Sequence, residues 1–334
     1  MTPQELLPYL NRLVEQQLHL SLMLWGPPGI GKSSIVADVA VRNDLQLVDL
    51  RLSQLAPTDL RGLPVADEKV SRWLPPEFLP TTGKGILFLD EINMAPPVMQ
   101  GIAQQLILDR QVGSYKVPDG WFIWAAGNRK SDRAAVFEMP SALANRFIHL
   151  DLVADLDSFK AWGMSAGVSE QVLAFLSFRS TLLHQIDAQR PAWPSPRSWV
   201  MADKLLAAGL SLEPAIGAGA SGEFEAFCTV YDKLPDLQKI LDGKGMDAKF
   251  PAEPSARYAT VLGLAFRAET AQHGINGLTW LVKGAGAEWV QFFATDLFRM
   301  LREKGQFGDF ARLMSSNADL KEFAKGMRDL IFSA

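Results

Sequence analysis

The chain has 334 residues, of which 48% are hydrophobic and 21% are charged, so it has the composition of an ordinary globular protein. It is long enough for one large domain or two smaller ones. A formal net charge of −4 argues against a surface built throughout for nucleic acid. Its single cysteine, Cys228, excludes an intramolecular disulfide and a cysteine-based metal cluster.

The first residues contain no basic stretch leading into an apolar segment, so we expect no signal peptide. No apolar run approaches the roughly 20 residues that span a bilayer, so we expect no membrane contact. Together these observations favour a cytoplasmic location.

Residues 1–152 alternate short apolar runs with amphipathic stretches. Thr2, a proline at position 3 and Glu5 predict a capped helix at the start. Further helices are predicted at 32–42, 96–110 and 141–146, and buried strands at 20–25, 45–50, 86–89, 122–126 and 147–152. This order predicts an α/β fold with a parallel sheet covered on both faces.

Two polar segments interrupt this alternation, at 62–73 and 111–121. Both contain Gly or Pro between residues that can form hairpins, although an ordinary surface loop is an equal alternative.

After residue 152 the pattern becomes helical. Helices are expected near 155–164, 169–187 and 198–209, with breaks at 211–222, 243–254 and 273–277. We therefore expect an α/β core at 1–153, an all-α segment at 154–210, called the lid below, and a C-terminal helical extension at 211–334. Aromatic residues of the extension have spacings that favour buried helix faces.

Residues 26–33 read GPPGIGKS and stand between a predicted strand and a predicted helix, the context in which such a loop binds phosphate. The glycines let backbone N–H groups face the phosphates, and the helix N-terminus adds positive potential. Lys32 is expected to reach the β- and γ-phosphates, and the Ser33 hydroxyl to bind Mg²⁺. The predicted nucleotide-binding residues are Gly26, Pro27, Pro28, Gly29, Ile30, Gly31, Lys32, Ser33 and Ser34.

Polar residues follow two later strands. Asp90 and Glu91 end the apolar run at 86–89, where Asp90 would orient Mg²⁺ and Glu91 would act as general base toward water. Asn128 ends the run at 122–126 and could hydrogen-bond the attacking water or the γ-phosphate, although a turn asparagine is the alternative.

Several arginines are candidates for completing the site. Arg146 precedes the last strand and cannot easily reach its own phosphates, so it is a candidate arginine finger for a neighbouring subunit, with Arg129 and Arg133 as competitors. Arg197, at a helix start, could couple the γ-phosphate to the lid. A surface salt bridge is the alternative for Arg146 and Arg197.

The order GPPGIGKS, LFLDEIN, AAGN, ALANRF and SPRSW resembles AAA+ ATPases, in particular the MoxR-like and dynein/midasin-related branch. The resemblance implies that Asn128 is sensor 1, Arg146 the arginine finger and Arg197 sensor 2. It also implies that 62–73 is the helix-2 insert and 111–121 the pre-sensor-1 hairpin, which face the ring pore or a partner.

The same resemblance implies a homo-oligomeric ring, usually a hexamer, that uses ATP and Mg²⁺ to remodel or activate a protein client. It implies a von Willebrand A-domain protein as a frequent partner.

Two other functions stay open. A nucleic-acid-associated motor or restriction-type NTPase, possibly using GTP, also ends its strand in DEIN, but the acidic balance and the lack of a dense basic stripe argue against it. A scaffold that binds nucleotide without hydrolysis conflicts with intact Lys32, Asp90, Glu91 and Asn128. His149 and His184 have no second histidine or cysteine at ligand spacing, so we expect neither to bind metal.

Overall fold

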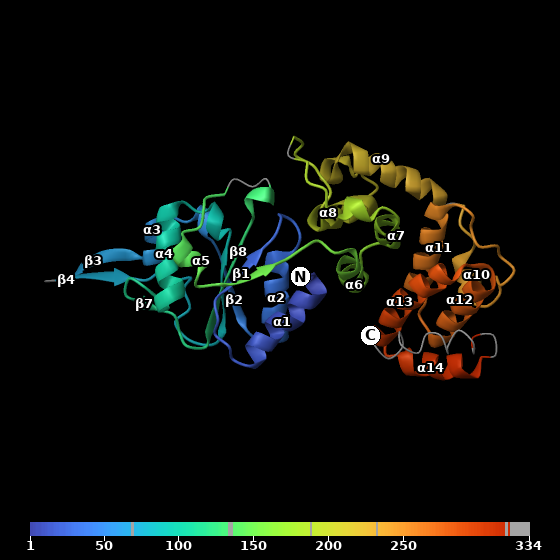
Figure 1. The fold of residues 1–334 in the computed structure, drawn as a ribbon, viewed down its shortest axis with the longest axis horizontal. Helices are drawn as coiled ribbons and strands as arrows, with labels where there is room; N and C mark the ends of the chain where they lie inside the picture. The colour runs from blue at the N-terminus through green and yellow to red at the C-terminus, as the bar shows by residue number, and fades with distance from the viewer. Residues whose placement is uncertain (68–69, 133–135, 188, 232, 318–319, 321–334) are drawn as a thin grey trace. The chain divides into compact units, whose positions relative to one another are not determined.

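The computed structural model describes residues 1–67, 70–132, 136–187, 189–231, 233–317 and 320 (Figure 1). Its contacts divide the chain into two compact units, Met1–Ser158 and Phe159–Ala334.

The first unit is built on a five-stranded parallel sheet. Its strand order is β2-β5-β8-β1-β9, with every neighbouring pair parallel. The α/β fold and its parallel sheet, predicted from the alternating apolar runs, are therefore confirmed. The strands are β1 (Leu22–Trp25), β2 (Gln46–Arg51), β5 (Gly85–Asp90), β8 (Trp121–Gly127) and β9 (Ile148–Asp151).

Helices cover both faces of this sheet (Figure 1). Alternate residues of each strand point to opposite faces, so the central strands contribute to two separate apolar clusters. One cluster packs against α1 (Pro3–Glu15) and α2 (Lys32–Arg42). The other packs against α3 (Pro57–Arg61), α4 (Pro97–Asp109) and α5 (Ser141–Ala144).

The start of α1 forms the predicted capping box. The Thr2 hydroxyl accepts from the Glu5 N–H at 3.3 Å, and the Glu5 carboxylate accepts from the Thr2 N–H at 2.9 Å. These bonds satisfy N–H groups that have no partner within the helix.

Both interruptions of the sheet are antiparallel hairpins. One pairs β3 (Leu63–Asp67) with β4 (Val70–Leu74), and the other pairs β6 (Gln111–Val112) with β7 (Tyr115–Lys116). The hairpin alternative of the sequence analysis is correct.

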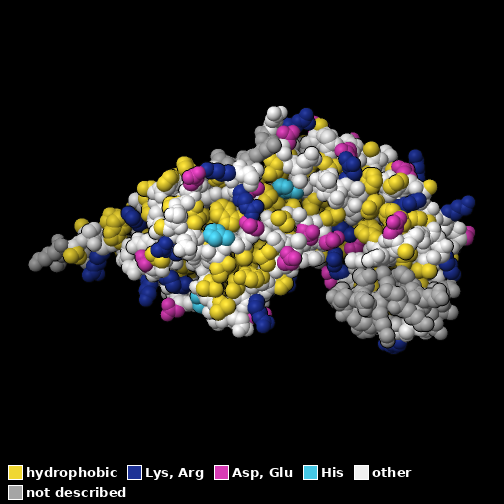
Figure 2. All heavy atoms as spheres, viewed as in Figure 1, with side chains coloured by type: hydrophobic (Ala, Val, Ile, Leu, Met, Phe, Trp, Pro, Cys, Tyr) yellow, Lys and Arg dark blue, Asp and Glu magenta, His cyan; other side chains and the backbone are white. Residues whose placement is uncertain are grey.

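The β3–β4 hairpin exposes an apolar face. Its register places Leu63 opposite Leu74, and Val65 and Val70 follow on the same face by two-residue alternation. Leu63, Val65, Val70 and Leu74 are 45–63% exposed, and the register places Arg72 on the same face, opposite Val65. Hydrophobic and basic side chains are visible on this projecting hairpin in Figure 2.

The second unit is helical in the residues described. Its elements are α6 (Leu156–Ala166), which begins just before the unit boundary, α7 (Glu170–Phe178), α8 (Pro196–Ala207), α9 (Glu213–Tyr231), α10 (Leu237–Leu241), α11 (Pro254–Arg267), α12 (Ala271–Gly284), α13 (Ala287–Glu303) and α14 (Phe307–Ser316). As predicted, the aromatic residues singled out in the C-terminal third lie in or against its main core: Trp280, Phe293, Phe298 and Phe310 are buried in it, and Trp289, Phe292 and Phe307 pack against it.

Three helix boundaries differ from the sequence prediction. The helix expected at 169–187 ends at Phe178 and gives way to a 3₁₀ turn, Ser180–Leu183, in which the Leu182 carbonyl accepts from the Trp199 indole at 2.7 Å. The break expected at 211–222 is confirmed in part: α9 begins at Glu213, and the non-helical backbone of Gly217, with φ 80°, divides it at a kink, but the helix continues from there through residue 222. Tertiary contacts decide both boundaries.

The break expected at 273–277 is wrong, because α12 is continuous there. Its glycines permit close packing: a Cβ on Gly274 would lie 3.0 Å from the Phe310 ring, and one on Gly277 would lie 2.9 Å from the Phe293 ring. The packing against these rings offsets the low helix propensity of glycine.

The helices of the predicted lid and extension lie in the same compact unit. Helix α7 packs against α11, and Arg267 of α11 pairs with Glu170 of α7. The division at residue 210 stays a prediction. In the described residues, no helix combines the length and apolarity needed to cross a bilayer.

A buried ion pair in the second unit joins α6 to α13. Lys160 Nζ lies 2.7 Å from Asp296 Oδ2 and 4.5 Å from the centre of the Phe292 ring, and the two charged side chains are 2% and 3% exposed. Arg299 Nη1 lies 3.8 Å from the other carboxylate oxygen. Such a pair is costly to break because the remaining charge stays buried.

We expect Asp296→Asn to lower the free energy of unfolding by about 3 kcal/mol or more, because it leaves the Lys160 ammonium without a counterion. Urea unfolding would measure the loss. The control is Asp38→Asn, which breaks an exposed pair with Arg42 and should cost less than about 1 kcal/mol. Equal losses in the two variants would contradict this interpretation.

Candidate active site

Several of the predicted site residues lie close together at the carboxyl edge of the parallel sheet. Because β1 lies next to β8, and β8 next to β5, the segments that follow these strands are neighbours. The phosphate loop follows β1, Asp90 ends β5, and Asn128 follows β8.

The phosphate loop runs from β1 directly into α2. Gly31 is the N-cap of α2 with φ 100°, a left-handed conformation that glycine adopts without a steric penalty. It carries no side chain to cap the first turn, so the N-terminus of α2 is suited to an anion.

Lys32 lies buried within this loop. Its ammonium donates to the Gly26 carbonyl at 2.6 Å, the Pro27 carbonyl at 3.0 Å and Asn128 Oδ1 at 2.9 Å. These three acceptors equal the number of N–H donors on a lysine ammonium. Lys32 therefore ties the phosphate loop to the end of β8 and brings together two residues that the sequence placed in one site.

Ser33 and Asp90 are in direct contact. The Ser33 hydroxyl donates to Asp90 Oδ2 at 2.7 Å, and Asp90 Oδ1 accepts from the Glu91 N–H at 2.9 Å. A hydroxyl and a carboxylate side by side are the oxygen ligands that Mg²⁺ prefers. The residues present fit the predicted magnesium site, in which Ser33 and Asp90 would hold the ion.

Glu91 has a partner that the sequence analysis missed. Ser53 lies in the 3₁₀ turn Leu52–Gln54 after β2. Its hydroxyl group donates a hydrogen bond to Glu91 Oε2. Glu91 itself has φ 56°, an uncommon conformation for a residue other than glycine. No motif surrounds Ser53, so only the adjacency of β2 and β5 reveals it.

Asn93 is a second missed residue. Its side-chain N–H donates to the Asn128 carbonyl at 2.6 Å, and its Oδ1 accepts from the Asn128 N–H at 3.2 Å. This pair of bonds, which we call the Asn93 clamp, fixes the backbone of Asn128. A Cβ on Gly127 would lie 2.4 Å from Asn93 Oδ1, so the clamp requires glycine at that position.

Asp49 adds a third carboxylate near Asp90 and Glu91. Partial burial raises the pKa of Asp49, the negative charge of Asp90 raises it further, and Arg51 opposes the shift. Asp49 could not be recognised as part of the site from the sequence, because it lies within a predicted strand rather than at its end.

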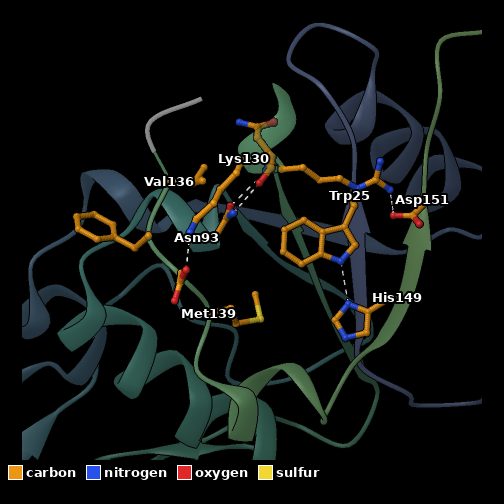
Figure 3. A pocket seen from close by; sticks show the side chains of 11 residues that line it. Trp25, Asn93, Lys130, Val136, Met139, His149 and Asp151 are labelled. Atoms are coloured by element: carbon orange, nitrogen blue, oxygen red, sulfur yellow. Dashed lines mark hydrogen bonds and ion pairs between the residues drawn. The ribbon is translucent and has the colours of Figure 1, made fainter. Parts of the chain in front are cut away.

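A pocket of about 360 Å³ opens beside Asn128 (Figure 3). Trp25 and His149 form one wall, with Asp151 beyond them, and Arg129 forms an ion pair with Asp151. Lys130, on the rim, pairs with Glu138.

The predicted arginines occupy different places. Arg146 is exposed in the turn after α5, where its guanidinium donates to the Ala142 carbonyl. Arg129, its first competitor, is paired with Asp151, and Arg133 lies outside the described residues. Arg197 is exposed at the start of α8 in the second unit. The roles of all four stay predictions.

We expect Gly127→Ala to lower the free energy of unfolding by about 1–3 kcal/mol, because the new methyl group overpacks against Asn93. The control is Gly101→Ala in α4, where a Cβ meets no atom within 4 Å. That substitution should stabilise the helix by up to about 1 kcal/mol. Similar effects of the two substitutions in urea unfolding would contradict the clamp.

The raised pKa of Asp49 predicts a pH-dependent stability. Since the folded state binds this proton more tightly than the unfolded state, ionised Asp49 destabilises the fold above its folded pKa. The penalty disappears as the pH falls below the unfolded value of about 3.9. We therefore expect Asp49→Asn to raise the free energy of unfolding at pH 7 without divalent cations, with a gain that shrinks toward pH 4.

Arg51→Gln supplies the opposite test, because it removes the charge that lowers the pKa of Asp49. It should destabilise the protein at pH 7 but not in the Asp49→Asn background. A gain from Asp49→Asn that stays constant between pH 7 and pH 4 would refute the electrostatic explanation.

Comparison with known proteins places part of the chain in a family. Residues 21–147 match the family described as AAA domain, dynein-related subfamily. Midasin from Giardia intestinalis is 29% identical over 138 residues, which are 39% of this chain and 3% of that protein. The chain thus spans only a small part of this curated relative's length.

Solved structures give weaker similarities. NtrX from Brucella abortus, in complex with ADP, aligns with 90% of this chain and 68% of its own, at 17% identity and a TM-score of 0.43. The RuvB Holliday junction branch migration motor from Thermotoga maritima aligns with 72% of this chain and 74% of its own, at 17% identity and a TM-score of 0.40. Scores this low carry no argument about function.

The sequence match covers four of the five strands of the parallel sheet, all but β9, together with the phosphate loop, Asp90, Glu91 and Asn128, which the structure brings to one edge. Residues 21–147 of the chain therefore form an AAA domain of the dynein-related subfamily.

Proposed function

We propose that the chain is an ATPase that hydrolyses ATP to ADP and phosphate with Mg²⁺. One observation carries the proposal: Lys32, Ser33, Asp90 and Asn128 are joined by hydrogen bonds at the mouth of the phosphate loop, with Glu91 next to Asp90. A scaffold that only binds nucleotide has no need for this set.

Each residue has a distinct task in this reaction. The loop backbone and Lys32 bind the phosphates, while Ser33 and Asp90 would hold the metal ion, which would supply positive charge against the charge on the phosphate oxygens. Glu91 accepts a proton from the water that attacks the γ-phosphorus. The bond from that phosphorus to the β–γ bridging oxygen breaks, so ADP leaves.

Asn128 orients the water or the γ-phosphate, because its side chain faces Lys32 and its backbone is held by Asn93. Ser53 holds Glu91 by a hydrogen bond, and we propose that this bond orients the base.

We propose further that the chain acts in a homo-oligomeric ring, in which Arg146 completes the site of the neighbouring subunit. Its exposure and its position in a turn support a contact outside its own chain. The expected ring is a hexamer, and Arg197 of α8 would respond to the γ-phosphate as sensor 2.

The finer role that we propose is the remodelling or activation of a protein client, as in MoxR-like ATPases, with a von Willebrand A-domain protein as a candidate partner. The exposed aliphatic face of the β3–β4 hairpin supports it, because burying Leu63, Val65, Val70 and Leu74 against a polypeptide would be favourable. On the face in Figure 2, basic side chains are scattered among acidic ones, which does not favour nucleic acid.

We expect Glu91→Gln to reduce the kcat for ATP by about 100-fold or more while ATP binding is kept, because the amide cannot accept the proton. Ser53→Ala should reduce kcat less, by about tenfold, since Glu91 keeps its carboxylate but loses its hydrogen bond. Phosphate release measures turnover, and sedimentation with ATP measures the ring, which Glu91→Gln should stabilise.

Unchanged turnover in Glu91→Gln would overturn the assignment of Glu91 as the base. A preference for GTP, or turnover stimulated by DNA or RNA at moderate salt, would instead favour the nucleic-acid-associated NTPase.

A further inference from the structure

A hydrogen-bonded relay connects the phosphate loop to the turn that carries Arg146. Trp25, the last residue of β1, precedes Gly26 directly and lies beside His149 of β9. The Trp25 indole Nε1–H donates to His149 Nδ1 at 2.8 Å, and the two rings are nearly parallel, at 12° with centroids 6.0 Å apart (Figure 3).

The second ring nitrogen of His149 reaches α5. Its Nε2 lies 2.8 Å from the Ala144 carbonyl oxygen. An indole nitrogen only donates, so Nδ1 must be the acceptor, and Nε2 then carries the hydrogen that is donated to Ala144. These bonds select the neutral Nε2–H tautomer, and the imidazole uses both nitrogens at once.

The Ala144 carbonyl closes the turn that presents Arg146. It also accepts from the Phe147 N–H at 3.2 Å, so Asn145 and Arg146 are the two residues between the ends of this turn. Leu143 and Phe147 are buried on either side of the turn, whereas Arg146 is exposed. His149 thus holds the carbonyl group at the start of the turn, and the burial of Leu143 and Phe147 in the core holds the residues that flank it.

The other end of the relay lies in the phosphate loop itself. Gly26, covalently bonded to Trp25, has the carbonyl that accepts from Lys32 Nζ at 2.6 Å. If this carbonyl shifts when Lys32 binds phosphate, the displacement would reach the Trp25 backbone through the covalent bond and His149 through the indole hydrogen bond. The contacts form a continuous path from a subunit's own site to the residue that we propose serves its neighbour's site.

We propose that His149 is a positioning residue that, through Trp25 and Ala144, sets the placement of Arg146 for the neighbouring subunit's ATP. This inference rests on the proposed function, because it requires Arg146 to act in trans. The two hydrogen bonds of the His149 ring go to Trp25 and Ala144, and not to Lys32, Glu91 or Asn128. Its effect therefore falls on hydrolysis in the neighbour.

The first measurement compares full-length variants by steady-state ATP hydrolysis. His149→Phe keeps the aromatic ring beside Trp25 but removes both hydrogen bonds. It should lower kcat by between about tenfold and 100-fold, the scale of a misplaced group, with KM for ATP unchanged. Trp25→Phe should lower kcat similarly, and His149→Gln, whose amide offers one acceptor and one donor, should keep more of the kcat than His149→Phe.

The second measurement mixes subunits to locate the defect. Glu91→Gln subunits do not hydrolyse ATP, yet they carry the intact relay and Arg146. In a mixture with excess Glu91→Gln subunits, the turnover of each His149→Phe subunit should rise. It should approach the turnover of a wild-type subunit mixed with Glu91→Gln subunits in the same ratio. Subunits with Glu91→Gln and Arg146→Ala together should produce no such rise.

The possible outcomes distinguish the positioning role of His149 from the trans role of Arg146 on which it rests. Unchanged turnover in Arg146→Ala would overturn the trans role of Arg146, and the inference with it, whatever His149 does. If Arg146→Ala is impaired, an unchanged kcat in His149→Phe overturns the inference alone. A His149→Phe defect that Glu91→Gln subunits fail to restore would place the effect within the subunit's own site, which also overturns it.

Discussion

The buried ammonium of Lys32 is the interaction on which the first unit's chemistry depends. It binds two carbonyls of its own loop and the side chain of Asn128, so a single charge joins β1 to β8. A buried cation requires such acceptors, since an uncompensated one would cost several kcal/mol. The same requirement makes Lys32 a strong ligand for phosphate, whose oxygens replace neutral acceptors with charged ones.

Around this charge, residues that do not bind the substrate position the residues at the edge of the sheet. The Asn93 side chain fixes the backbone of Asn128, Gly127 makes room for it, and Ser53 holds Glu91. These residues make the edge rigid, which matters because hydrolysis requires the water, the base and the phosphate to be held together. On the far side of β1, Trp25 and His149 extend the same network to α5.

The second unit is organised by a different constraint. Its helices are packed by aromatic side chains, and close approach is made possible by glycines in α12 that face the rings of Phe293 and Phe310. The buried pair of Lys160 and Asp296 fixes α6 against α13. Helices from the predicted lid and the predicted extension therefore share one compact unit, so a movement of the lid would involve α11 to α13 as well.

The sequence by itself determined the parallel sheet and the residues of the central site, but it left hairpins and surface loops as equal alternatives for 62–73 and 111–121. Buried parallel strands appear as apolar runs, and a phosphate loop has a fixed spacing, so Lys32, Ser33, Asp90, Glu91 and Asn128 could be found from local patterns. It did not determine the positions of Ser53, Asp49 and Asn93 in the site, because their partners lie on other strands. It also mistook the glycines of α12 for a break, since only tertiary packing shows what fills the space above a glycine. The link from Trp25 through His149 to Ala144 was likewise decided by the tertiary structure, because β1 and β9 are adjacent in the sheet but more than a hundred residues apart in the chain.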